Sequence, residues 1–183
     1  MESEEKKMSY YTLSNKELSQ LIRKDLKKHG FLKKDYSIRV RDCTYDTSVS
    51  IRIKNPLVRI SEIEEITKKY KSVYYDEYSQ EILAGGNVYL HCQYESGIFD
   101  AVTESLHQMA EKILDSVTYT GMKIAENDDT EISIIKSDNV TCFLYMTDKK
   151  TMQYDFPKRY IIHWWKDLAI ALWRFQNLGT IYA

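Results

Sequence analysis

The chain has 183 residues, enough for one good core or for a core with a smaller lobe attached. Hydrophobic residues make up 43% of it and charged residues 29%, a balance that excludes wholesale disorder. The formal net charge is −1, from 26 basic and 27 acidic residues, so no global basic excess favours binding to phosphate. Any contact with nucleic acid must therefore depend on a local cluster of basic residues.

The first thirteen residues, 1–13, precede the first helix signal, and we expect them to form a flexible N-terminus. Ser14 and Glu17 have the spacing of a capping box, in which each side chain binds a backbone N–H at the start of a helix. Apolar residues at helical spacing follow, and they predict a helix that ends near Gly30.

Two alternating runs, 36–41 and 49–54, predict half-buried strands that pair as an antiparallel hairpin. Their polar positions carry four basic residues: Arg39, Arg41, Arg52 and Lys54. If the strands pair, these side chains share one face of the sheet. The cluster is then either a contact for phosphate or for an acidic protein surface, or an ordinary solvated sheet face.

Ser61 and Glu64 form a second apparent capping box, which predicts a short helix that ends near residue 71. The segment 74–78 is expected to be a polar, aromatic connection or a short strand. The glycine-rich residues 85–87 predict a turn, and alternation over 88–94 predicts the next strand.

Tyrosine is used unusually often, with 15 copies in the chain. Periodicity does not assign six of these residues firmly to the core: Tyr10, Tyr11, Tyr74, Tyr75, Tyr78 and Tyr89. The last four of them are the candidates for a binding surface. Because tyrosine combines a large rigid contact area with a polar tip, these residues are candidate partner-binding residues. The alternative is that they complete the core.

Apolar spacing over 99–117 predicts one long helix, and strands are expected near 119–124, 131–136, 140–146 and 152–154. The last helix, over 160–177, is apolar around most of its circumference, so it should be buried on every side. It is expected either to be central to the fold or to form a homodimer contact through Trp164, Trp165 and Trp173.

The order of elements, α-β-β-α-β-β-α followed by β-β-β-α, predicts an α+β fold with antiparallel sheet and helices packed on one face. Alternating βαβ units are not expected. We predict that residues 14–117 form one α+β domain, and that residues 118–183 form a β-hairpin and an apolar helix packed on it as one unit.

The sequence contains no recognisable catalytic or metal-binding motif. The four histidines lack metal-ligand spacing, and a phosphate-binding loop, a nucleophile elbow and a zinc-protease motif are all missing. We therefore expect a protein that is not an enzyme and that has no cofactor and no metal.

The cysteines Cys43, Cys92 and Cys142 form no CxxC pair, which favours buried free thiols in a reducing cytoplasm. The most apolar stretch, 161–175, is too short to span a bilayer, so we expect no membrane segment.

Residues 18–94 resemble the small α+β domains associated with large polyvalent proteins of phages and conjugative elements. The resemblance rests on the leading helix, the strands 36–41 and 48–53, the helix from Ser61 and the segment 75–87. As a whole, the chain also resembles anti-CRISPR proteins of the type II-A group, which inhibit the RNA-guided DNA nuclease of the bacterial host.

This resemblance implies a stoichiometric inhibitor that binds a host type II CRISPR-Cas nuclease in the bacterial cytoplasm and hinders DNA binding or cleavage. Many inhibitors of this class are acidic DNA mimics, whereas this chain is nearly neutral, so occlusion or trapping of the nuclease is favoured. The residues themselves support an alternative: a small nucleic-acid-binding accessory protein of a phage or mobile element that uses the basic face of the hairpin.

Overall fold

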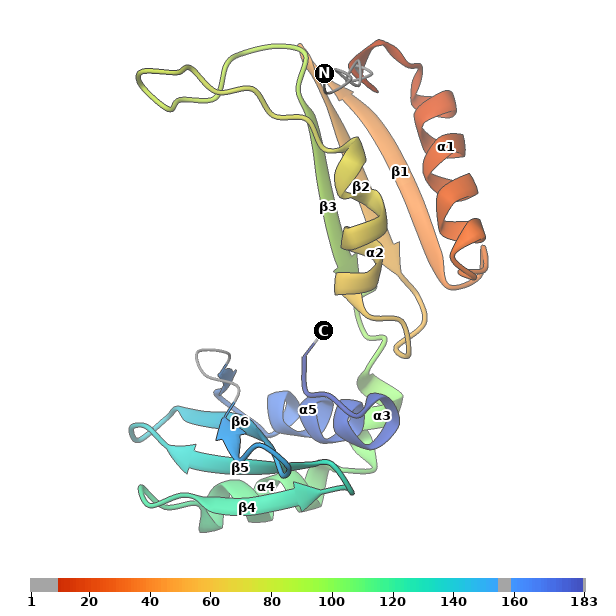
Figure 1. Ribbon diagram of the computed structural model, residues 1–183. Coiled ribbons are helices and arrows are strands. Elements are labelled where there is room, and N and C mark those ends of the chain that lie inside the picture. The colour runs from red at the N-terminus through yellow and green to blue at the C-terminus, as the bar shows by residue number, and fades with distance from the viewer. Residues whose placement is uncertain (1–9, 155–158, 183) are drawn as a thin grey trace. The chain divides into compact units, whose positions relative to one another are not determined.

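The computed structural model describes residues 10–154 and 159–182, and it divides into two compact units, Met1–Ile98 and Phe99–Ala183 (Figure 1). Both units combine helices with a sheet, so the predicted α+β class is confirmed. The expected boundary at residues 117 and 118 moves to residues 98 and 99, because the helices that follow Ile98 pack into the second unit. The predicted flexible N-terminus lies, as far as residue 9, outside the described residues.

Unit 1 begins with the short 3-10 helix η1 (Tyr10–Thr12) and the helix α1 (Asn15–Lys28). The predicted capping box is present: the backbone N–H of Glu17 donates to the Ser14 hydroxyl at 3.3 Å. In return, the Glu17 carboxylate accepts the backbone N–H of Ser14 at 2.9 Å. The chain leaves α1 through Gly30, whose φ of 89° suits glycine.

The sheet of unit 1 has the strand order β1-β2-β3, with β1 (Tyr36–Cys43), β2 (Asp46–Ile53) and β3 (Val88–Tyr94). The predicted antiparallel hairpin of β1 and β2 is confirmed. β3 pairs in parallel with β2, after a crossover through α2 (Ile60–Thr67) and the 3-10 helix η2 (Lys68–Tyr70). The sheet is therefore mixed and contains a βαβ unit, because a helical crossover returns the chain in the direction of the earlier strand.

The helices α1 and α2 lie on one face of this sheet and bury it (Figure 1). Fully buried side chains come from both helices and from two of the strands, β2 and β3: Leu18, Ile22, Leu26, Ile63, Val49, Ile51, Ile53 and Val88. The second predicted capping box is wrong. α2 begins at Ile60 behind Arg59, so Ser61 already lies inside the first turn and makes no cap.

Unit 2 begins with two helices, α3 (Asp100–Glu104) and α4 (His107–Ser116), where one long helix was predicted. The hydroxyls of Thr103 and Ser105 donate to the carbonyls of Phe99 and Val102, at 2.8 and 3.2 Å. Such bonds compete with the regular helical pattern, and the helix is interrupted at this point.

An antiparallel sheet follows, with β4 (Met122–Glu126), β5 (Thr130–Lys136), β6 (Cys142–Asp148), β7 (Gln153–Tyr154) and β8 (Tyr160–Ile162). The last helix, α5 (Trp165–Leu178), begins later than predicted. The carboxylate of Asp167 accepts the backbone N–H groups of His163 and Trp164, which fixes the start of the helix there. Residues 160–162 pair with β6 instead.

The helix α5 packs with α4 against one face of this sheet. Its buried residues include Leu168, Ala171, Leu172 and Phe175, which join Ile132, Ile134 and Leu144 of the strands in one core. The helix is thus central to unit 2, as one of the two predicted alternatives required. Within the described ranges, no helix combines the length and the apolar character that a bilayer crossing needs.

Candidate binding face of unit 1

The face of the unit 1 sheet opposite α1 and α2 presents polar side chains in three cross-strand rows. From the turn end of the hairpin onward, the rows are Arg41–Ser48–Tyr89, Arg39–Ser50–His91 and Ser37–Arg52–Gln93. Because side chains alternate along a strand, their sequence neighbours point into the core instead. We call the surface formed by these three rows the open face.

Each strand contributes a different kind of side chain to the open face. β1 supplies the cations of Arg39 and Arg41, β3 supplies the rings of Tyr89 and His91, and β2 supplies a short hydroxyl side chain between them in each of these rows. Neighbouring strands lie about 4.8 Å apart, so roughly 10 Å separates the cationic column from the aromatic column. The short serine side chains of β2 thus separate a basic column from an aromatic column. We call this arrangement the trough, and its two columns the basic wall and the aromatic wall.

A hollow of about 490 Å³ lies on the β1 side of this trough and is lined mainly by its arginines and serines. The three guanidinium groups of Arg39, Arg41 and Arg52 are exposed, and none forms a hydrogen bond or ion pair with another described residue. They are available to an anionic partner.

One acidic side chain, that of Asp46, lies beside the three rows at the turn end, and it is held by hydrogen bonds. The Asp46 carboxylate accepts the backbone N–H and the side-chain amide of Asn87, at 3.0 and 2.9 Å. The three rows lie in the described part of the chain, and they contain no acidic residue. The open face thus carries a local positive charge although the whole chain is nearly neutral.

Three of the four predicted basic residues therefore come together on the open face. Lys54 follows Arg52 by two residues, beyond the end of β2, and its side chain is exposed. Its backbone N–H donates to the carbonyl of Asp35 at 2.7 Å, which anchors this end of the strand. Lys54 thus adds its charge at the rim of the trough and not within it.

The predicted tyrosines Tyr74, Tyr75 and Tyr78 lie in the loop 71–87 between η2 and β3. Their side chains are 45%, 53% and 94% exposed, so none of them completes the core. Ile82 and Leu83 of the same loop are also about half exposed. The loop extends away from the end of the sheet (Figure 1) and presents an apolar, aromatic surface.

Internal hydrogen bonds give this loop a defined shape. Tyr75 and Ile82 form an isolated antiparallel β-bridge. The Asn87 side-chain oxygen accepts the backbone N–H of Tyr74 at 2.9 Å. At the tip, the Asp76 carboxylate accepts the backbone N–H groups of Ser79 and Tyr78, and these bonds lower the pKa of Asp76. We call residues 71–87 the tyrosine loop.

Tyr89 connects the tyrosine loop with the open face. Its side chain is half-buried in the first row, and its pKa is raised by loss of solvation and by the nearby groups of Asp46 and Tyr75. Tyr89 lies two residues after the end of the tyrosine loop, so the aromatic wall begins where the loop joins β3.

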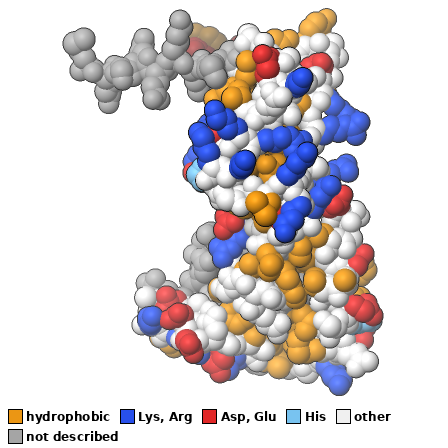
Figure 2. Space-filling view, turned by 90° about the vertical axis from the view of Figure 1, so that its right-hand side faces the viewer, with side chains coloured by type: hydrophobic (Ala, Val, Ile, Leu, Met, Phe, Trp, Pro, Cys, Tyr) orange, Lys and Arg blue, Asp and Glu red, His pale blue; other side chains and the backbone are white. Residues whose placement is uncertain are grey.

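A second basic surface lies on the side of α1, where Figure 2 shows Lys and Arg side chains gathered on unit 1. Lys24 and Lys27 of α1 are exposed there, and neither forms an ion pair with another described residue. Lys28 pairs with Asp25 at 3.6 Å. This surface lacks the row arrangement of the open face. Its two lysines without ion pairs carry the same charge as Arg39 and Arg41, so their substitution is a matched control for substitution of those arginines.

The tryptophans of the predicted dimer contact have different surroundings. Trp165 stacks on His107 of α4 with ring centroids 3.8 Å apart, and Trp173 meets the ring of Phe99 edge-on at 5.9 Å. Both hold α5 within unit 2. Only Trp164, 61% exposed, offers its ring to a partner, so the dimer contact stays a prediction that rests on this residue.

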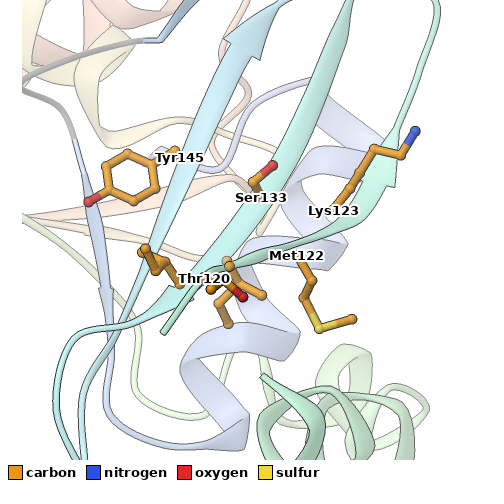
Figure 3. A pocket seen from close by; sticks show the side chains of 8 residues that line it. Thr120, Met122, Lys123, Ser133 and Tyr145 are labelled. Carbon is orange, nitrogen blue, oxygen red and sulfur yellow. The ribbon is translucent and has the colours of Figure 1, made fainter. Parts of the chain in front are cut away.

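The sheet of unit 2 has its own uncovered face, with a hollow of about 490 Å³ beside Thr120, Lys123, Ser133 and Tyr145. Lys123 extends away from the serine and the tyrosine (Figure 3), and its ammonium group binds Glu126 at 3.0 Å. The hollow therefore brings no acid and base together.

The three cysteines differ in their exposure. Cys92 and Cys142 are buried as predicted, and burial raises the pKa of the Cys92 thiol to about 11. Cys43 is exposed, contrary to the prediction, because it ends β1 on the side of the open face. Among the described residues, no group of His, Cys, Asp and Glu could hold a metal ion.

The chain matches no known family model, no curated protein and no solved structure. Its function must therefore be argued from the surfaces described above.

Proposed function

We propose that the chain is a non-catalytic binding protein that takes a polynucleotide on the open face of unit 1. The observation that carries this proposal is the set of three exposed guanidinium groups in adjacent rows. They lie opposite a β3 column that consists of two aromatic rings and the side-chain amide of Gln93. Guanidinium groups bind phosphate in a bidentate geometry, and phosphate contacts position a nucleic acid on its protein. Rings and amides across the trough suit contacts with bases.

The expected strength of binding follows from the number of cations. Three arginines that each neutralise one phosphate release about three counterions, so the logarithm of affinity should fall with the logarithm of salt with a slope of about −2 for a single strand. Such binding is moderate, and it should be measured at low and defined salt. A protein with a strongly basic surface would show a steeper slope.

Fluorescence anisotropy of labelled DNA and RNA oligonucleotides, in a salt series, tests this proposal. The variant Arg39→Ala/Arg41→Ala should lower the affinity at least tenfold and should make the slope less steep by about 1.4. The variant Lys24→Ala/Lys27→Ala removes the same charge from α1 and should change neither quantity appreciably. Equal losses in the two variants, or no binding by the wild type, would contradict the proposal.

A second candidate function is the stoichiometric inhibition of a type II RNA-guided nuclease. The tyrosine loop favours it, because exposed tyrosine and aliphatic side chains are typical of protein interfaces. A guide-loaded nuclease offers both a protein surface for the loop and a polynucleotide for the open face.

This second candidate is tested with target cleavage and co-elution on size exclusion, using a panel of guide-loaded type II nucleases. Inhibition should saturate at a simple stoichiometric ratio, and the variant Tyr75→Ser/Tyr78→Ser should weaken it. If the wild type neither co-elutes with any nuclease nor inhibits cleavage, this candidate is wrong, while polynucleotide binding alone remains open to the anisotropy test.

A further inference from the structure

We infer that the open face selects single-stranded over double-stranded polynucleotide, with the backbone along the arginines of β1 and the bases stacked on Tyr89 and His91 of β3. The inference rests on the proposed function and names the substrate class of the same site. It is carried by the order of the columns across the sheet, by the spacing of the two rings and by the way each ring is held.

The order of the columns suits one strand. A nucleotide has its phosphate at one end and its base at the other, and the trough has cations on one wall and rings on the other. The floor between these walls consists of the short side chains Ser48 and Ser50, which leave room for a sugar. A duplex presents phosphates at its outer edges and hides the faces of its bases, so it could use the basic wall only.

The spacing of the rings requires an unstacked strand. Tyr89 and His91 are two residues apart along β3, so their positions differ by about 6.7 Å. Successive bases in a duplex strand are only about 3.4 Å apart. Two neighbouring bases can therefore lie on both rings only if the strand is extended, which a single strand allows and a duplex does not.

Both rings have neighbours that restrain them. Tyr89 is half-buried, so the side chains packed around it limit the motion of its ring. The Nε2 atom of His91 lies 3.2 Å from the Oε1 atom of Gln93, a contact that orients the imidazole. A restrained ring loses little freedom when a base stacks on it, so these rings are good stacking platforms.

The first measurement compares the dissociation constants of wild-type protein for a fluorescent single strand and for the duplex of the same sequence, each as DNA and as RNA. Both single strands should bind at least tenfold more tightly than their duplexes. Alanine substitution at stacking platforms of this kind changes affinity by about 5- to 150-fold per base. Loss of one ring should therefore lower single-strand affinity by a factor in this range.

The second measurement uses the variants Tyr89→Leu and His91→Leu, with Tyr89→Phe as the conservative control. The leucine variants should weaken single-strand binding and leave duplex binding within twofold, whereas the phenylalanine variant keeps a ring and should keep the affinity. A single strand that carries 2-aminopurine should be quenched by the wild type and by Tyr89→Phe, and less by Tyr89→Leu. Circular dichroism melting curves check that each variant is folded.

The outcomes separate this inference from the proposed function. Equal affinity for single strand and duplex, lost in the arginine variant, would overturn the inference and leave the proposed function standing. Single-strand preference that survives both leucine variants would overturn the stacking arrangement. No binding of either form would overturn the proposed function as well.

Discussion

Arg39 of β1 and His91 of β3 lie in the same cross-strand row, one on each side of Ser50, on the sheet face opposite both helices of unit 1. A guanidinium group and an imidazole ring thus face one another across a short hydroxyl side chain. In the proposed arrangement one nucleotide spans this row, with its phosphate on the arginine and its base on the histidine. Two residues that hold the same nucleotide should not act independently.

A double-mutant cycle tests this relationship. The variants Arg39→Ala and His91→Leu should each weaken single-strand binding, and the double variant should lose less than the sum of the two effects. We expect a coupling free energy of about 0.5–3 kcal/mol, the range for residues that share a partner. The cycle of Lys24→Ala with His91→Leu serves as the control and should be additive to within about 0.5 kcal/mol. Additivity in the first cycle would show that the row does not hold one nucleotide.

The exposed thiol of Cys43 allows the site to be mapped without a mutation in the trough. Cys43 borders the hollow of the open face, whereas Cys92 and Cys142 are buried. In native protein, Ellman's reagent should modify one thiol quickly, and all three should react after denaturation. A saturating oligonucleotide should slow the fast reaction several-fold, because it covers the rim of the trough. As a control, Cys43→Ser should abolish the fast phase. If bound oligonucleotide leaves the rate of the fast phase unchanged, the ligand binds elsewhere.

Much of this face was predicted from the sequence, because it depends on local pairing. The runs 36–41 and 49–54 alternate cleanly, and a short connection forces them into a hairpin, so the shared face of Arg39, Arg41 and Arg52 followed directly. The alternation over 88–94 also showed that Tyr89, His91 and Gln93 point to one side. It did not show which strand lies beside them.

The missing step was the parallel pairing of β3 with β2. This pairing depends on α2 packing against the sheet through residues such as Ile63, which is a tertiary contact and leaves no local pattern. The division of the chain was missed for a similar reason. Hydrophobic spacing over 99–117 is helical throughout, and only the core contacts of α4 with α5 show that it belongs to unit 2.

The stability of unit 1 should depend on pH through Asp25. Its carboxylate forms a salt bridge with Lys69 and accepts the hydroxyl of Tyr70 at 2.6 Å, and these contacts lower the pKa of Asp25 from 3.8 to about 2. Because the folded pKa is lower than the unfolded one, the contribution is complete above about pH 4 and is lost as the pH falls towards 2. The lowering of the pKa corresponds to about 2 kcal/mol of stability. Little of this is lost to screening by solvent, because the Asp25 side chain is only 13% exposed.

Urea unfolding of wild type and Asp25→Asn at several pH values measures this contribution. At pH 6 the variant should be less stable by about 2 kcal/mol, and the difference should shrink as the pH falls through about 2 and vanish below it. Glu65→Gln is the matched control, because the Glu65 side chain is 70% exposed in its pair with Lys68 and should contribute little. A difference for Asp25→Asn that stays constant with pH would assign the effect to packing and not to charge.

The two units should unfold separately, and tryptophan fluorescence should report on one of them. All three tryptophans, at positions 164, 165 and 173, belong to unit 2. Ile51→Ala, in the core of unit 1, should lower the free energy of unfolding of that unit by about 2–5 kcal/mol and leave the fluorescence transition in place. Leu144→Ala, in the core of unit 2, should shift the fluorescence transition by a similar free energy. If each variant shifted both the unfolding of unit 1 and the fluorescence transition of unit 2, the chain would be a single cooperative unit.

Residues 1–98 should bind polynucleotide without the rest of the chain. The fragment contains every residue of the three rows, the tyrosine loop and a core of its own, in which side chains of α1, α2 and β2 are fully buried. We therefore expect a folded fragment whose single-strand affinity lies within about threefold of the full chain, measured by anisotropy at the same salt concentration. The fragment 99–183, which lacks the arginine column, is the control and should bind at least tenfold more weakly. If the first fragment is folded by circular dichroism and still fails to bind, the trough is not sufficient, and residues of unit 2 must contribute to the site.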